Sequence, residues 1–206
     1  MSSDRVPTQF AASLLRMARD SGYDLSAIQH SAGLEFDVLD SSAPDWQAEI
    51  SAMQYTRIYQ QALSLLQDET FGLHPERVVN PGAFRMMCYC IIPCENLGKA
   101  IKRATEFYRT FFDDGSALYA NFTDAHARVG YRDMGGRGPH RVDAADAYGL
   151  STWHRFFGWL TGRPIELLRV DFLGEPPKNL SKYEELFSCP LYFNQASNLL
   201  RSEEHT

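Results

Sequence analysis

The sequence predicts an α+β fold, with a helical N-terminal half followed by a small antiparallel or mixed sheet that is covered by helices. Two patterns lead to this class. Apolar residues recur at three- and four-residue steps through residues 1–112, which is typical of helices. After the turn signature Asp113-Asp114-Gly115 they alternate with polar residues, which is typical of strands. We expect one domain over 1–206, helical over about 1–112 and mixed over about 113–200.

The helical half contains five predicted helices, over residues 7–21, 24–30, 51–67, 82–92 and 95–112. The third is expected to bury Met53, Ile58 and Ala62 on one side. The fourth is apolar on nearly every side, so we expect it to be buried. The fifth lines its apolar residues along one face and has Asn96 or Glu95 in position to cap its N-terminus.

The mixed half opens with a predicted hairpin, whose two strands run over 117–122 and 127–131. A long helix over 143–161 follows, then a strand over 166–173 that places Leu168, Val170 and Phe172 on one face. A short helix over 180–187, an extended segment over 191–193 and a last strand from Asn198 complete the chain.

Composition and charge limit the classes of function. The net charge is −6, and most basic residues have acidic neighbours. A domain that held DNA by itself would show a basic face, so direct nucleic-acid binding is not expected.

No run of about 18 apolar residues is present, and Arg16, Arg19 and Asp20 interrupt the stretch where a signal peptide would be apolar. We therefore expect a cytoplasmic protein with no membrane partner.

The four cysteines are Cys88, Cys90, Cys94 and Cys189. No CxxC motif or Cys/His cluster accompanies them, so their spacing does not predict a metal site. Reduced thiols that pack as small hydrophobic groups are the favoured interpretation, and a redox or metal role is the alternative.

An enzyme based on a thiol would need Cys88 or Cys90 close to His154 and to an acid such as Asp146. No nucleophile motif surrounds either cysteine. We therefore expect no catalytic residues, no metal and no other cofactor.

Several short segments occur in an order that is known from one protein family. They are Gly22-Tyr23-Asp24, Ala32-Gly33-Leu34, Phe71-Gly72-Leu73, Gly82 with Tyr89, Asn96-Leu97-Gly98-Lys99-Ala100, Tyr108, Thr161-Gly162-Arg163, Val170-Asp171-Phe172, Pro176-Pro177, Tyr183, Phe187 and Cys189-Pro190-Leu191-Tyr192-Phe193-Asn194. Through them nearly the whole chain resembles the N-terminal effector-binding, arabinose-binding-like domain of AraC-type transcriptional regulators. Met87-Cys88 departs from the smaller residues that the family more often has there.

The resemblance implies a regulatory domain of a bacterial transcription factor, which binds a small organic effector and controls an attached DNA-binding domain. In the family a basic tandem helix-turn-helix domain follows the strand that begins near Leu200, and we expect it to lie outside these 206 residues. DNA would be contacted only through that domain, and the chain would act as a homodimer. An oligomerisation module without a ligand, or a thiol-based redox sensor, are the alternatives.

The effector site is expected beside the helix over 82–92, because a sensor needs a mostly apolar cavity with a few polar groups. The candidate ligand-binding residues are Arg85, Cys88, Tyr89, Tyr108, Phe112, Trp153, His154 and Phe157. Arg85 is the lone charge on its helix and would hold a carboxylate, which favours an apolar or amphipathic acid as the effector. The competing interpretation makes the aromatic residues ordinary core, Arg85 a solvated side chain and His154 a hydrogen-bonded core residue.

Overall fold

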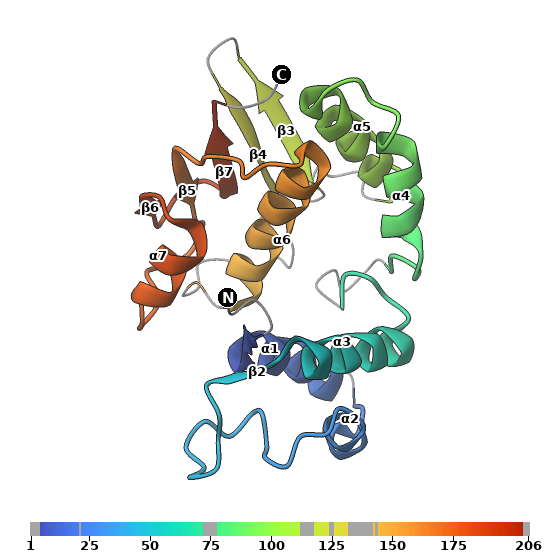
Figure 1. The fold of residues 1–206 in the computed structure, drawn as a ribbon, viewed down its shortest axis with the longest axis vertical. Helices are drawn as coiled ribbons and strands as arrows, with labels where there is room; N and C mark the ends of the chain where they lie inside the picture. The colour runs from blue at the N-terminus through green and yellow to red at the C-terminus, as the bar shows by residue number, and fades with distance from the viewer. Residues whose placement is uncertain are drawn as a thin grey trace. The chain divides into compact units, whose positions relative to one another are not determined.

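The computed structural model describes residues 5–20, 22–71, 78–111, 118–123, 126–131, 142 and 144–203. The chain divides into two compact units, Met1–Ala83 and Phe84–Thr206, and each is described by itself. Helices dominate the first unit, and a five-stranded sheet with helices forms the second (Figure 1). The predicted α+β class is therefore confirmed, whereas the expectation of a single domain stays a prediction.

The described residues of the first unit form three helices and one short pair of strands. The helices are α1 (Thr8–Asp20), α2 (Leu25–Ser31) and α3 (Ala52–Leu66), and the strands are β1 (Arg5–Pro7) and β2 (Glu49–Ser51). All three helices were predicted within one or two residues. The antiparallel β1–β2 pair was not predicted, because three-residue strands are too short to show an alternating pattern.

Side-chain caps fix the starts of two helices in this unit. Asp24 accepts a hydrogen bond from the Ser26 amide at the start of α2, and its bonds to the Ser26 hydroxyl and amide lower the pKa of the Asp24 carboxyl. Ser51 accepts from the Gln54 amide, while the Gln54 side chain accepts from the Ser51 amide, which forms a capping box at the start of α3.

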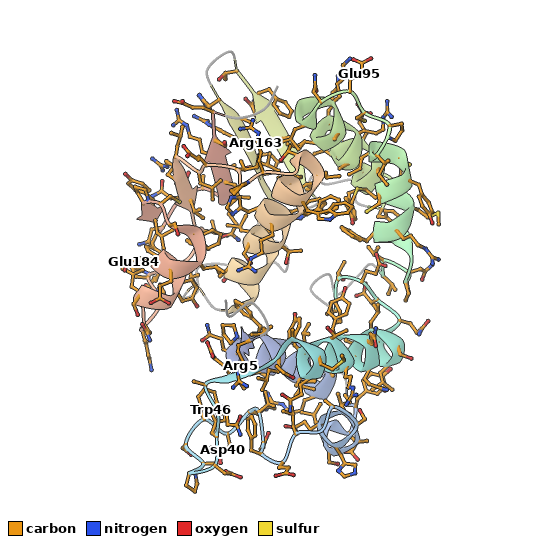
Figure 2. All side chains as sticks on the ribbon, viewed as in Figure 1. Arg5, Asp40, Trp46, Glu95, Arg163 and Glu184 are labelled. Atoms are coloured by element: carbon orange, nitrogen blue, oxygen red, sulfur yellow. The ribbon has the colours of Figure 1, made fainter. Side chains whose placement is uncertain are left out.

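The core of the first unit lies between α1 and the elements packed against it, and includes Leu15, Ile28, Val38, Ile50 and Ile58. Trp46, labelled in Figure 2, packs against this core and donates a hydrogen bond from its indole nitrogen to the Val38 carbonyl oxygen, at 3.2 Å. The expectation that α3 buries Met53 is wrong. That side chain is 63% exposed, because it lies in the first turn of α3, off the face that carries Ile58 and Ala62.

The second unit is a mixed sheet with helices. The helices are α4 (Ala83–Ile91), α5 (Leu97–Arg109), α6 (Ala144–Thr161) and α7 (Ser181–Phe187), and the strands are β3 (Tyr119–Phe122), β4 (Ala127–Tyr131), β5 (Arg169–Asp171), β6 (Leu191–Tyr192) and β7 (Asn198–Ser202). The strand order is β3-β4-β7-β5-β6, and every pair is antiparallel except β5 with β6 (Figure 1). All nine elements were predicted: β4 has the expected bounds, β7 begins at the expected residue, and β3, β5 and β6 are shorter than expected.

One face of this sheet, the inner face, carries the row Ala120, Val129, Leu200, Val170 and Leu191. Its side chains pack against helices: Val129 belongs to a core cluster with residues of α4, α5 and α6, and Val170 to one with residues of α6 and α7. The opposite, outer face carries the row Asn121, Arg128, Arg201 and Arg169, and is described below.

Helix α4 is not buried on all sides, and the expectation that it would be is wrong. Ala83, Met87 and Ile91 recur at four-residue steps and are buried, whereas Phe84 and Tyr89 are 38% and 63% exposed. An apolar composition on every side of a short helix does not tell which side faces the core, because packing decides it. The cap of the next helix was predicted correctly, since Asn96 accepts from the Lys99 amide at the start of α5.

Candidate functional site

The residues predicted to bind a ligand meet, in part, around one tryptophan. Trp153 lies in the middle of α6 and is half-buried. Its ring centroid is 5.9 Å from that of Tyr108 on α5 and 5.6 Å from that of Phe157 one turn along α6. Three of the eight predicted residues are therefore in contact, and they belong to a core cluster with side chains of α4, α5 and α6.

Further aromatic rings extend this group into what we call the aromatic cluster. Its members are Phe84, Phe107, Tyr108, Phe111, Trp153, Phe156, Phe157 and Trp159. Most of the contacts are tilted or edge-to-face, which is the arrangement that aromatic pairs prefer. Phe156 and Trp159 stack with an interplanar angle of 16°.

Phe84 and Phe156 were not predicted from the sequence, although both touch Trp153. Their ring centroids lie 6.5 Å and 5.9 Å from that of Trp153, and they contact each other at 5.2 Å. Phe156 directly precedes a predicted residue and stands three positions after Trp153, so the spacing of α6 was the available signal. For Phe84 no local signal existed, because its partners are about 70 residues away.

The other residues predicted on α4 are divided between the core and the surface. Cys88 packs against the core that contains Met87 and Phe157. Arg85 and Tyr89 are exposed and stand one turn apart on α4. The ligand role of these three residues stays a prediction, as does that of Phe112, which lies outside the described residues.

His154 is fixed by the backbone. Its Nε2 atom lies 2.7 Å from the Ile165 carbonyl oxygen. A carbonyl oxygen only accepts hydrogen bonds, so Nε2 carries the proton in this bond. The bond joins α6 to the segment that leads into β5, which is the structural role that the competing interpretation gave to His154.

The cluster offers a small molecule apolar surface and aromatic ring faces. Such faces bind apolar groups and, through their quadrupoles, cations as well.

Among the described residues no group of three His, Cys, Asp or Glu side chains is placed to hold a metal ion. In the same part of the chain, no helix combines the length and apolar character that a membrane crossing needs.

The described thiols differ in environment. Cys90 is exposed, while Cys88, Cys94 and Cys189 are partly buried. Burial raises the pKa of the Cys189 thiol from 9.0 to about 11. Because the thiolate is the reactive form, Cys189 is a poor nucleophile at neutral pH.

We expect iodoacetamide to modify Cys90 well before Cys189 in the folded protein. At pH 8 the raised pKa lowers the thiolate fraction of Cys189 about 100-fold relative to an unshifted thiol, and this fraction should rise about tenfold per pH unit up to pH 11. Peptide mass spectrometry after timed labelling measures both sites. The Cys90→Ser variant is the control for site assignment, and rapid oxidant-induced pairing of two native cysteines would instead support the redox alternative.

Comparison with known proteins gives the class of this chain. The family described as the arabinose-binding domain of AraC transcription regulator, N-terminal, matches residues 22–205. The chain belongs to this family of effector-binding domains of AraC-type regulators, and the resemblance noted in the sequence is confirmed.

A particular relative is the ornithine utilization regulator of Pseudomonas aeruginosa strain PAO1. It is 27% identical to this chain over 195 residues, which make up 94% of the chain and 55% of that protein. The chain thus spans about half the length of this curated relative.

Proposed function

We propose that this chain is the ligand-sensing module of a bacterial transcription factor, that it binds a small organic effector at the aromatic cluster, and that it controls an attached DNA-binding domain. Family membership supports a sensor. The observation that carries the location is Trp153, whose ring touches aromatic side chains from α4, α5 and α6. A ligand inserted there would contact all three helices.

The proposed mechanism is a shift between two packings of these helices. A ligand changes such an equilibrium only through its different affinity for the two packings. Side chains on α4, α5 and α6 that move together around Trp153 would transmit binding to the surface of the unit. A homodimer would use this change to alter how its two DNA-binding domains are placed.

The proposed effector is a small acid with an apolar or amphipathic body. Aromatic surface suits the body, and Arg85 on the exposed side of α4 would hold the carboxylate. The relative is named for ornithine utilization, so ornithine and other amino acids belong in the set of compounds tested, together with aliphatic and aromatic carboxylic acids and their amides.

A thermal-shift screen combined with tryptophan fluorescence tests this proposal. An effector at about 100 times its dissociation constant should stabilise the protein by roughly 2.7 kcal/mol. A variant with Trp46→Phe and Trp159→Phe leaves Trp153 as the reporter, and its emission should change when the effector binds. Arg85→Ala should remove the response to acids while the response to the matching amides persists.

Controls separate the location from the function. A stabilising compound that leaves the emission of Trp153 unchanged would move the site away from the aromatic cluster. An unchanged acid response in Arg85→Ala would remove Arg85 from the site. No stabilisation across the whole panel, with a stable dimer in sedimentation experiments, would favour the oligomerisation module.

A further inference from the structure

Three arginines stand side by side on the outer face of the sheet. Arg201 on β7 is the register partner of both Arg128 on β4 and Arg169 on β5. Side chains at register partners point to the same face of a sheet, and like charges placed directly opposite each other destabilise it. The three guanidinium groups therefore repel one another unless negative charge lies close to them. They stand together although the net charge of the chain is −6.

One of the three arginines has its own anion. The Arg169 guanidinium lies 2.7 Å (Nε) and 2.5 Å (Nη2) from the Asp171 carboxylate, and its central carbon is 3.9 Å from the centre of the Tyr192 ring. The carboxylate and the ring face together compensate its charge. At Arg169, therefore, one carboxylate and one aromatic ring stabilise the guanidinium group on the outer face.

The other two arginines are arranged differently. Arg128 is exposed. The Nε atom of Arg201 is buried and, within the described part of the chain, makes no hydrogen bond, while Nη2 lies 3.4 Å from His126 Nδ1. A buried charged donor is normally paired with an acceptor. Arg201 therefore has a buried donor without an acceptor among the described residues, next to a register partner, Arg128, whose side chain is exposed.

The charges near the row limit the kind of acceptor. Among the described strands and their ends, Asp171 and the exposed Glu203, two residues after Arg201, are the carboxylates that accompany the three guanidinium groups. The three guanidinium groups and the two carboxylates together carry one net positive charge. A bound carboxylate with a single negative charge would neutralise this net charge, whereas a phosphate dianion would leave one net negative charge.

We propose that the outer face of the sheet binds a carboxylate group between Arg128 and Arg201. Guanidinium groups recognise carboxylates through paired N–H donors, and Arg201 Nε supplies one of them. The aromatic cluster packs with inner-face residues such as Val129, so this site lies on the other side of the sheet. It goes beyond the proposed effector site and does not rest on it.

The test uses the full chain labelled with ¹⁵N and titrated with acetate, a singly charged carboxylate, at an ionic strength held constant with chloride. We expect the Nε–H signal of Arg201 to shift with saturation. Arg128→Gln and Arg201→Gln should each weaken binding about tenfold or more, because each removes a charge-assisted hydrogen bond. Arg57→Gln removes an exposed charge from α3 and should leave the affinity unchanged.

Two comparisons identify the source and the chemistry of the ligand. Comparing the affinity of acetate with that of a tetraglutamate peptide distinguishes a free acid from an acidic protein segment as the source of the carboxylate. Inorganic phosphate should bind more weakly than acetate, and tighter phosphate binding would overturn the assignment to a carboxylate. The proposal also fails if the Arg201 signal moves equally in chloride alone, or if Arg57→Gln weakens binding as much as Arg201→Gln.

A stability measurement separates binding from a structural role. If the row is a binding device, Arg128→Gln relieves repulsion, and its melting temperature in chloride should be no lower than that of the unmodified chain. A clear loss of stability in this variant would show that Arg128 supports the fold instead, and would overturn the proposal.

Discussion

Replacing Phe172 with alanine should lower the free energy of unfolding of the second unit by about 3–5 kcal/mol. The side chain follows β5 directly and is 0% exposed. Its ring stacks on Phe193 with centroids 5.4 Å apart and meets Tyr183 and Phe187 edge-to-face. Alanine would leave a cavity lined by three aromatic rings, and rings of this size cannot collapse into it without leaving their preferred rotamers.

Urea denaturation, followed by hydrogen exchange of amides in β5 and α7, measures this effect in the unit concerned. Phe172→Leu keeps most of the volume and should cost about 1–2 kcal/mol. Leu168→Ala is the control, because Leu168 stands on the same strand segment and is 42% exposed. A loss below about 1.5 kcal/mol for Phe172→Ala would mean that the neighbouring rings rearrange to fill the space.

The contrast between Leu168 and Phe172 shows what the sequence can predict about this fold. Both alternate with polar residues and were placed on one face, yet Phe172 is buried against three aromatic rings from later in the chain, whereas Leu168 is 42% exposed. Periodicity predicts the element and its faces but not how far along a face other segments cover it. Helix caps are more local, so Asp24 and Asn96 could be identified from sequence.

The candidate sites were harder to predict from the sequence than the helix caps, because their residues come from distant parts of the chain. Tyr108, Trp153 and Phe157 were found because each lies on the apolar stripe of a long helix. The row of arginines was not, because Arg128, Arg169 and Arg201 are distant in sequence and become neighbours only through the β4-β7-β5 strand order. That order joins a hairpin strand to the last strand, and no local pattern specifies it.

The same strand order makes Gly130 irreplaceable. Gly130 on β4 pairs with Tyr119 on β3 and with Leu199 on β7. A Cβ atom at this position would lie 2.1 Å from the Asn198 carbonyl oxygen and 2.9 Å from the Leu199 Cα atom. Backbone atoms of a central strand cannot rotate away, so Gly130→Ala should cost more than the roughly 1–3 kcal/mol that is usual for overpacking, and should separate β4 from β7.

Gly149→Ala provides a matched comparison. Its added Cβ atom would lie 2.3 Å from the hydroxyl of Tyr131, the end of a side chain that donates to the Asp146 carbonyl oxygen at 2.8 Å. A side chain can move, so this variant should lose only about 1–2 kcal/mol, mainly through that hydrogen bond. Tyr131→Phe by itself loses this hydrogen bond and removes the nearest obstructing atom. Gly149→Ala should therefore cost less in the Tyr131→Phe background than in the unmodified chain, whereas the cost of Gly130→Ala should be the same in both backgrounds.

Hydrogen exchange of the β4 and β7 amides distinguishes the two outcomes, because only separation of the strands removes protection along both. Arg128→Ala, two residues earlier on the same face of β4, controls for substitution in this strand and should change stability little, since its side chain is exposed. If Gly130→Ala retains protection in β7, then β4 must shift its register rather than detach. A shift by one residue would turn Val129 from the inner face to the outer face and expose its core cluster.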